Sequence, residues 1–298
     1  MNIQSFIKNK INTILLIIGG IISSNMVYAE ISVLDDIGHK ITLKTPAKNI
    51  ISLSPGLTEL VFSAGGGEYL KGVVSYSNYP EAANDIPQVG SYNAVDIEKI
   101  VALNPDLILS WESGNPSMQI SMLKKLGLNV FTSKPRDFSD VPSTIQRLGI
   151  LMNTASLAQA SAKNFNTRLE NLKKRFPKTN HKKSVFVQIW DKPLMSISGE
   201  HLISKIVEQC NGENIFNKVK QLTVSLDIET VIQKDPDIIL ATREGNLGNS
   251  WLSQWKQWDF LTSVKNNRLY TVNPDYVVRH TPRILDGIEQ VCSFIHSK

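Results

Sequence analysis

Aromatic side chains recur in the predicted loops of this sequence, at or just after the ends of predicted strands. They are Tyr76, Tyr79, Tyr92, Trp111, Trp190 and Tyr276. Ligands of α/β folds bind outside the carboxyl ends of the parallel strands, which is where these rings would lie. Aromatic rings bury a large area and stack on other flat groups. The pattern therefore predicts a binding site for a large, flat, mostly apolar ligand.

One charged pair accompanies these rings. Asp275 and Arg279 are four residues apart in the last of the predicted loops, so that each can compensate the charge of the other. Buried charges are stable only when they are paired. A site with one balanced pair suits a ligand of little net charge better than a trianionic ferric chelate.

The sequence offers one catalytic motif, a Ser-x-x-Lys match at residues 121–124, but it lies within a predicted helix and lacks the partner motifs. The sequence contains no nucleophile elbow, phosphate-binding loop, zinc-protease helix or paired-cysteine motif. The five histidines are scattered without the spacing of metal ligands, at His39, His181, His201, His280 and His296. We therefore expect a binding protein without catalytic residues, a metal site or a cofactor.

The first 29 residues have the features of a secretory signal peptide. Lys8 and Lys10 supply the positive start, residues 11–22 the apolar run, and residues 27–29 a small-residue cleavage site. The apolar run is too short for a secure membrane span. No cysteine lies near the cleavage site, which argues against a lipid anchor. We expect export to the periplasm of a Gram-negative cell.

The only two cysteines, Cys210 and Cys292, both lie in the second half of the chain. In an oxidising compartment, such a pair is most simply a disulfide. A metal site is the alternative, but the spacing is not Cys-x-x-Cys and no histidine cluster accompanies it.

Length and charge limit the classes of function. A chain of 298 residues has room for two domains of ordinary size. The net charge of +5 is modest, and no basic face carries interleaved aromatics, so nucleic-acid binding is not expected.

An internal repeat indicates how the chain is organised. Residues 96–109 read DIEKIVALNPDLIL, and residues 227–240 read DIETVIQKDPDIIL. Each copy predicts a helix with an aspartate N-cap, a proline stop and a buried apolar strand. A weaker sequence similarity relates residues 52–54 (SLS) to residues 196–198 (SIS), each of which precedes a predicted helix. The repeat predicts two similar α/β lobes with a ligand cleft between them.

One long amphipathic helix is predicted between the two lobes. Apolar residues at spacings of three and four run through residues 154–176, without an internal glycine or proline. We therefore divide the chain into a signal peptide (1–29), a first lobe (30–152), a backbone helix (153–177) and a second lobe (178–298). The fold class is α/β, with two lobes tied by one helix.

Several motifs resemble a known family. They are ISLSP with TEL in residues 51–60, VSYSNYP in 74–80, ExIVALxPDL in 98–107, CxGENIF in 210–216 and Pro282-Arg283. Together they are similar to the substrate-binding proteins of cobalamin and iron–chelate ABC importers, and within that family to its cobalamin branch. The resemblance covers nearly all of the mature chain.

The resemblance implies a carrier that binds cobalamin (vitamin B12) in the cleft and delivers it to a membrane permease. The implied ligand contacts fall on Tyr76, Tyr92, Trp111, Asp275, Tyr276, Val277, Val278 and Arg279. Tyr92 replaces a tryptophan of the family. In the second lobe, Leu222 or Thr223 and Met195 stand where the family has a tryptophan and a phenylalanine.

The resemblance also implies partners. Glu98 and Glu229 occupy equivalent positions of the repeat and match the acidic residues that dock such carriers on the importer. The expected partner is a two-fold ABC permease of the inner membrane with its ATPase subunits, and the carrier is expected to be a monomer.

Two alternatives of the same fold remain open. A haem carrier would use Tyr76, Tyr276 or His280 as the iron ligand. A ferric-siderophore carrier would need additional cationic groups in the cleft.

Overall fold

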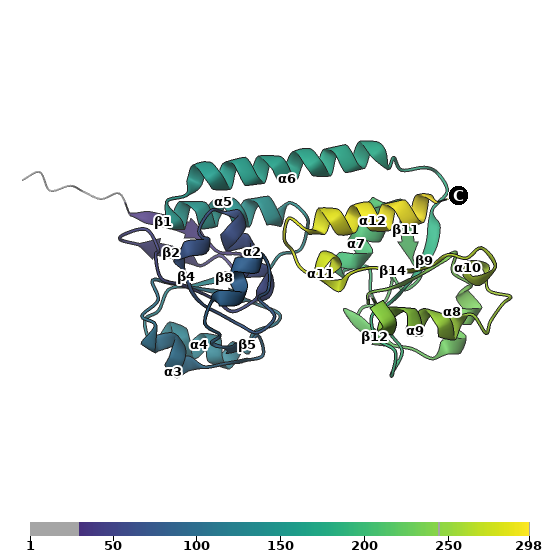
Figure 1. Cartoon of the computed structure of the whole chain (residues 1–298), viewed down its shortest axis with the longest axis horizontal. Coiled ribbons are helices and arrows are strands. Elements are labelled where there is room, and N and C mark those ends of the chain that lie inside the picture. Colours follow the sequence, from purple (N-terminus) through teal and green to yellow (C-terminus); the bar gives the residue numbers. More distant parts are fainter. Residues whose placement is uncertain (1–29, 244, 298) are drawn as a thin grey trace, which may run out of the picture. The chain divides into compact units, whose positions relative to one another are not determined.

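A computed structural model describes residues 30–243 and 245–297 (Figure 1). The predicted signal peptide lies outside these described residues. No helix in the described ranges combines the length and the apolarity that crossing a membrane requires.

The elements before the long helix form the first lobe, around a parallel sheet with the strand order β4-β3-β7-β8. Its strands are β3 (Ile50–Ser52), β4 (Leu70–Val73), β7 (Leu107–Trp111) and β8 (Val130–Ser133). Its helices are α2 (Pro55–Ser63), α3 (Ile97–Ala102), α4 (Ser117–Lys125) and α5 (Asp140–Met152). Small elements complete it, namely the hairpin of β1 (Ile31–Leu34) and β2 (Lys40–Leu43), the pair β5 (Gly90–Ser91) and β6 (Ala94–Val95), and the 3-10 turns Gly67–Tyr69 and Glu81–Asp85.

The second lobe repeats this plan around a sheet with the order β11-β9-β13-β14. Its strands are β9 (Lys183–Gln188), β11 (Gly212–Asn214), β13 (Ile238–Ala241) and β14 (Leu269–Thr271). Its helices are α7 (Leu202–Gln209), α8 (Ile228–Lys234), α9 (Gly245–Trp255), α10 (Thr262–Lys265), α11 (Pro274–Val277) and α12 (Ile284–His296). The two sheet orders correspond strand for strand, which confirms the duplication predicted from the repeat.

The helices of the repeat begin as predicted, with one difference in detail. The Asp96 carboxylate accepts a hydrogen bond from the Lys99 amide at 3.0 Å and caps α3. Asp227 holds the same position before α8, but its side chain makes no capping bond. The strand after each helix is buried, apart from the partly buried Trp111 at the end of β7, because helices cover both faces of the parallel sheet.

The predicted correspondence between residues 52–54 and residues 196–198 is wrong, because the two segments do not belong to equivalent strands of the two lobes. By position in its sheet, the counterpart of β3 is β9, whereas residues 195–197 form β10 (Met195–Ile197). This strand pairs with β12 (Thr223–Ser225) in a separate two-stranded antiparallel sheet. The second lobe thus has an extra strand between β9 and its first helix.

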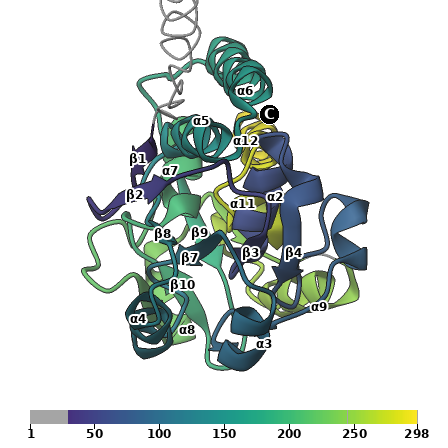
Figure 2. The same ribbon diagram turned by 90° about the vertical axis from the view of Figure 1, so that its left-hand side faces the viewer.

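The helix α6 (Ala155–Arg175) connects the lobes, as the periodicity predicted. Its apolar stripe is buried and consists of Ala158, Ala162, Phe165, Leu169 and Leu172. The helix packs on α5 of the first lobe and on α12 of the second, which Figures 1 and 2 both show. One apolar core therefore continues from the first lobe along α6 into the second, while each lobe has a separate core on the far face of its sheet.

Candidate functional site

A cavity of about 240 Å³ lies where the first lobe meets the segment after α11. Most of its wall comes from the start of α2 and from the carboxyl ends of first-lobe strands, as expected for a parallel sheet. The lining residues are Ser54, Pro55, Gly56, Leu57, Leu60, Tyr76, Tyr92, Trp111, Ser133, Pro135, Asp140, Val141, Thr144, Val278, Arg279 and His280.

Tyr76 stands at the cavity in an unusual backbone conformation. Its φ is +66°, in the left-handed region that side chains other than glycine seldom adopt. The carbonyl of Tyr76 accepts from the Asn78 amide at 3.0 Å, so the turn after β4 is closed by hydrogen bonding. The side chain is 73% exposed and has little contact with the rest of the protein. A ligand in the cavity could therefore cover most of this ring.

Trp111 and Tyr92 form a second aromatic part of the wall. Their ring centroids are 6.3 Å apart at a tilt of 49°. The Asn115 side chain positions both loops, since its oxygen accepts from the Trp111 amide at 2.6 Å. Its nitrogen donates to the carbonyls of Tyr92 at 2.7 Å and Leu53 at 2.8 Å. Asn115 is buried, and sequence reasoning did not identify it.

Arg279 carries the charge on the second-lobe side of the cavity. The predicted pair with Asp275 is present, with Nη2 of Arg279 2.8 Å from Oδ1 of Asp275. A second acidic partner of Arg279 was not predicted from the sequence. This partner is Glu59 on α2, whose Oε1 lies 2.9 Å from Nη1 of Arg279. Arg279 further donates to Oδ1 of Asn78 at 3.3 Å.

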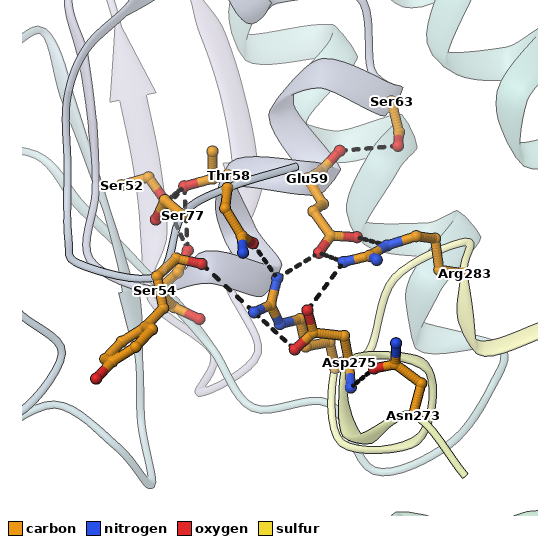
Figure 3. A network of polar contacts seen from close by, with 12 residues as sticks. Ser52, Ser54, Thr58, Glu59, Ser63, Ser77, Asn273, Asp275 and Arg283 are labelled. Atoms are coloured by element: carbon orange, nitrogen blue, oxygen red, sulfur yellow. Dashed lines mark hydrogen bonds and ion pairs between the residues drawn. The ribbon is translucent and has the colours of Figure 1, made fainter. Parts of the chain in front are cut away.

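Glu59 is the centre of this polar network, which Figure 3 shows between α2 and the segment around α11. Arg283 donates through Nε to Oε2 of Glu59 at 3.0 Å and through Nη2 to Oε1 at 2.5 Å. The guanidinium of Arg283 also stacks on the Tyr79 ring at 4.0 Å. Burial opposes the charge of Arg283, but the hydrogen bond and charge of Glu59, together with Asp275, raise its pKa above the ordinary value.

Two buried histidines, His280 in the cavity lining and His201 close to it, are in their neutral form. Burial lowers the pKa of His280, which lines the cavity, to about 4. Burial likewise lowers the pKa of His201 to about 4. Asp140 is the acidic lining residue, and its carboxylate accepts from the amides of Arg136 and Asp137 at 2.6 and 2.8 Å.

The structure brings only part of the predicted ligand set to the cavity. Tyr76, Tyr92, Trp111, Val278 and Arg279 line it. The other three predicted contacts lie outside the lining. Asp275 reaches the cavity only through its pair with Arg279, Tyr276 packs against the core, and Val277 is fully buried within that core.

The second lobe adds no phenylalanine, tyrosine or tryptophan ring to the lining that the structure describes. Trp190 follows β9 but packs edge-on against Trp251, with 48% of its surface exposed. Leu222 is 53% exposed and Met195 pairs within the extra two-stranded sheet. The cavity is therefore aromatic on its first-lobe side only.

Glu98 and Glu229 lie in the first turns of α3 and α8, one on each lobe. Both side chains are exposed, and neither is in an ion pair with another described residue. They are not part of the cavity lining.

Cys210 and Cys292 form a disulfide, as predicted. The bond joins the end of α7 to α12 and is buried. Across residues 30–243 and 245–297, no group of three or more His, Cys, Asp or Glu side chains could hold a metal ion.

Comparison with known proteins gives matches over most of the chain. The family described as "Periplasmic binding protein" matches residues 50–276. A vitamin B12-binding protein of Vibrio campbellii is 33% identical over 247 residues, which cover 83% of this chain and 89% of that protein.

Solved structures agree with this result. The periplasmic vitamin B12 binding protein BtuF of Vibrio cholerae is 33% identical, with a TM-score of 0.78 over 84% of this chain and 97% of that one. The periplasmic heme-binding protein RhuT of Roseiflexus is 18% identical, with a TM-score of 0.73 over 84% of this chain and 98% of that one. The latter likeness concerns the fold alone.

Proposed function

The chain belongs to the periplasmic binding protein family, and from this premise we propose that it binds cobalamin and delivers it to an ABC importer. The relatives named as vitamin B12-binding proteins support this choice of ligand. In this proposal the protein acts in the periplasm of a Gram-negative cell after loss of its signal peptide. It works as a monomer and as a carrier, not as an enzyme.

The observation that carries the proposal is the character of the cavity wall. Tyr76, Tyr92 and Trp111 offer aromatic surface, while the one permanent cation among the described lining residues, Arg279, is paired with two carboxylates. Such a wall suits a flat macrocycle whose periphery carries neutral amides. A cavity of about 240 Å³ is smaller than a corrinoid, so the ring would lie partly inside it and partly beyond its mouth.

Calorimetric titration of the purified mature protein with cyanocobalamin tests this function. Trp111→Ala should weaken binding about tenfold or more, because covering a large aromatic side chain contributes about 1.5–3 kcal/mol. Met118→Ala is the matched control, since Met118 is 83% exposed and does not line the cavity. The cobalamin assignment fails if the wild-type protein shows no heat of binding at micromolar concentrations.

A haem carrier is the second candidate, and one specific observation favours it. Tyr76 and His280 both line the cavity, and the low pKa of His280 leaves its ring free of the proton that would prevent iron coordination. Haemin should then give an absorption band of a tyrosinate or histidine complex. Loss of that band in Tyr76→Phe or His280→Ala would support this reading over the cobalamin reading.

For delivery, we propose that Glu98 and Glu229 form salt bridges with arginines on the periplasmic face of a two-fold permease. Their exposure, their lack of an intramolecular ion pair among the described residues, and their equivalence in the repeat support this role. Glu98→Ala with Glu229→Ala should abolish carrier-dependent uptake and leave ligand affinity unchanged. Weaker ligand binding would instead assign these residues to the cleft, and normal uptake would leave them as helix-end charges.

A further inference from the structure

Glu59 is a buried carboxylate and the only charged residue of helix α2. Only 2% of its surface is exposed, and its neighbours Leu57, Leu60 and Val61 are buried core residues. A buried charge is costly unless it is paired and hydrogen-bonded. Both oxygens of Glu59 meet this condition through guanidinium groups of the second lobe, more than 200 positions later in the chain.

The charges around this contact cancel. Arg279 and Arg283 bring two positive charges, and Glu59 and Asp275 bring two negative ones, all joined by ion pairs. The remaining ionisable side chains of the described lining do not add a cation, because Asp140 is acidic and His280 is kept neutral by burial. A negative group that enters the cavity therefore meets no unpaired cation there.

Arg279 is the member of this set that a ligand would meet. It lines the cavity, whereas Glu59 and Arg283 lie behind it, towards the core. Ion pairs and a hydrogen bond hold its guanidinium, through Glu59 at 2.9 Å, Asp275 at 2.8 Å and Oδ1 of Asn78 at 3.3 Å. The Arg279 side chain is 11% exposed, so its guanidinium is held at the cavity and not spread into solvent.

Taking the proposed binding function as the premise, we propose that Glu59 determines the charge class of the ligand. By neutralising Arg279 and Arg283 from behind, it makes the cavity select a neutral macrocycle over a carboxylate-bearing chelate of similar size. Glu59 is thus a specificity-determining residue that does not touch the ligand. Its removal would leave one uncompensated guanidinium charge at the cavity, and that charge would attract anions.

Glu59→Gln tests this role, because glutamine keeps the shape of the side chain and removes only its charge. The matched probes are cyanocobalamin and its monocarboxylic acids, in which one peripheral amide is hydrolysed to a carboxylate. The quantity of interest is the ratio of the two dissociation constants, because any general loosening of the site cancels from it. At an effective dielectric constant of ~20, one charge acting across roughly 10 Å changes an affinity about tenfold. We expect Glu59→Gln to shift the ratio by this factor in favour of the carboxylate.

Two control variants distinguish the effect of the lost charge from a change in the structure of the site. The double variant Glu59→Gln with Arg283→Gln restores the balance of charges and should return the ratio to its wild-type value. Asp286→Asn removes an acidic partner of Arg168 on α6, outside the cavity lining, and should leave the ratio unchanged. An unchanged ratio in folded Glu59→Gln overturns the proposal, and so does a double variant that keeps the shifted ratio.

A titration with haemin distinguishes two negative outcomes, namely that the protein does not bind cobalamin and that Glu59 does not determine the charge of the ligand. If the wild-type protein binds no corrinoid, the cobalamin assignment fails, yet haemin with its two propionates still reports whether Glu59→Gln improves anion binding. If Glu59→Gln does not fold, Asp275→Asn releases the same charge from a carboxylate that is 30% exposed. That variant should shift the ratio in the same direction, and no shift in it contradicts the proposal.

Discussion

Replacing Tyr76 separates the energetics of binding from those of folding at one residue. The ring is 73% exposed, so its truncation removes few contacts of the unliganded protein. Tyr76→Ala should therefore change the free energy of unfolding by less than about 1 kcal/mol, in the range of surface substitutions. Tyr76→Gly also relieves the left-handed φ of +66°, by about 1–2 kcal/mol, and this gain is partly offset by the greater freedom of glycine in the unfolded chain. The glycine variant should be as stable as the wild type or slightly more stable.

The affinity for the ligand should decrease in both variants, although the stability stays nearly constant. Covering a whole large aromatic side chain contributes about 1.5–3 kcal/mol. With 73% of this side chain available to a ligand, the loss is roughly 1–2 kcal/mol, or about 5- to 30-fold in the dissociation constant.

Calorimetry with cyanocobalamin measures the affinity, and urea denaturation measures the stability. Met118→Ala, on the exposed face of α4, serves again as the control and should change neither quantity. The reasoning is refuted if folded Tyr76→Ala binds within about twofold of the wild type, a difference of about 0.4 kcal/mol. A loss of stability above about 2 kcal/mol in Tyr76→Ala would also refute it, because the ring would then belong to the core.

Three further changes test other parts of the structure. Replacing Cys210 and Cys292 by alanine opens a link across 82 residues and should lower stability by roughly 4 kcal/mol in urea denaturation, with unchanged ligand affinity. His201 and His280 have folded-state pKa values of about 4, below the unfolded value of about 6.5, so the unfolded chain binds more protons between these limits. Stability should therefore fall as the pH decreases from about 6.5 to 4, by about 1–3 kcal/mol per histidine, and a smaller fall in the two His→Gln variants would confirm the source. Asn115→Ala leaves buried backbone groups unpaired, so it should cost about 1–3 kcal/mol and also weaken ligand binding through the two aromatic loops that it positions.

Sequence patterns predicted the helices and strands because these elements depend on the spacing of apolar residues close together in the chain. The helix from Ala155 to Arg175 follows from apolar residues at spacings of three and four, and β7 and β13 follow from the apolar run after the proline stop of each repeat copy. The mistaken pairing of residues 52–54 with 196–198 has a similar origin. Both segments overlap the end of a short, largely buried strand before a helix, and such a segment does not specify which sheet it joins.

The candidate site was predictable only in part, for a physical reason. Tyr76 and Trp111 could be placed because the carboxyl ends of parallel strands meet at one edge of the sheet. Glu59 and Asn115 could not, since their roles depend on hydrogen bonds to groups that only the tertiary fold brings near. One sequence signal for Glu59 exists, namely an acidic residue inside the apolar run of α2, where an uncompensated charge would not be tolerated.

The duplication of the scaffold and the one-sided cavity together suggest a division of roles between the lobes. Both lobes present an exposed glutamate at the start of an equivalent helix, which suits a partner of two-fold symmetry. The cavity does not share this symmetry, because its aromatic rings come from the first lobe and its paired cation comes from the second. A single ligand has no need of two-fold symmetry, whereas a two-fold permease does. In the proposed docking role, the repeat therefore supplies the surface that meets the partner, while the cavity lining does not follow it.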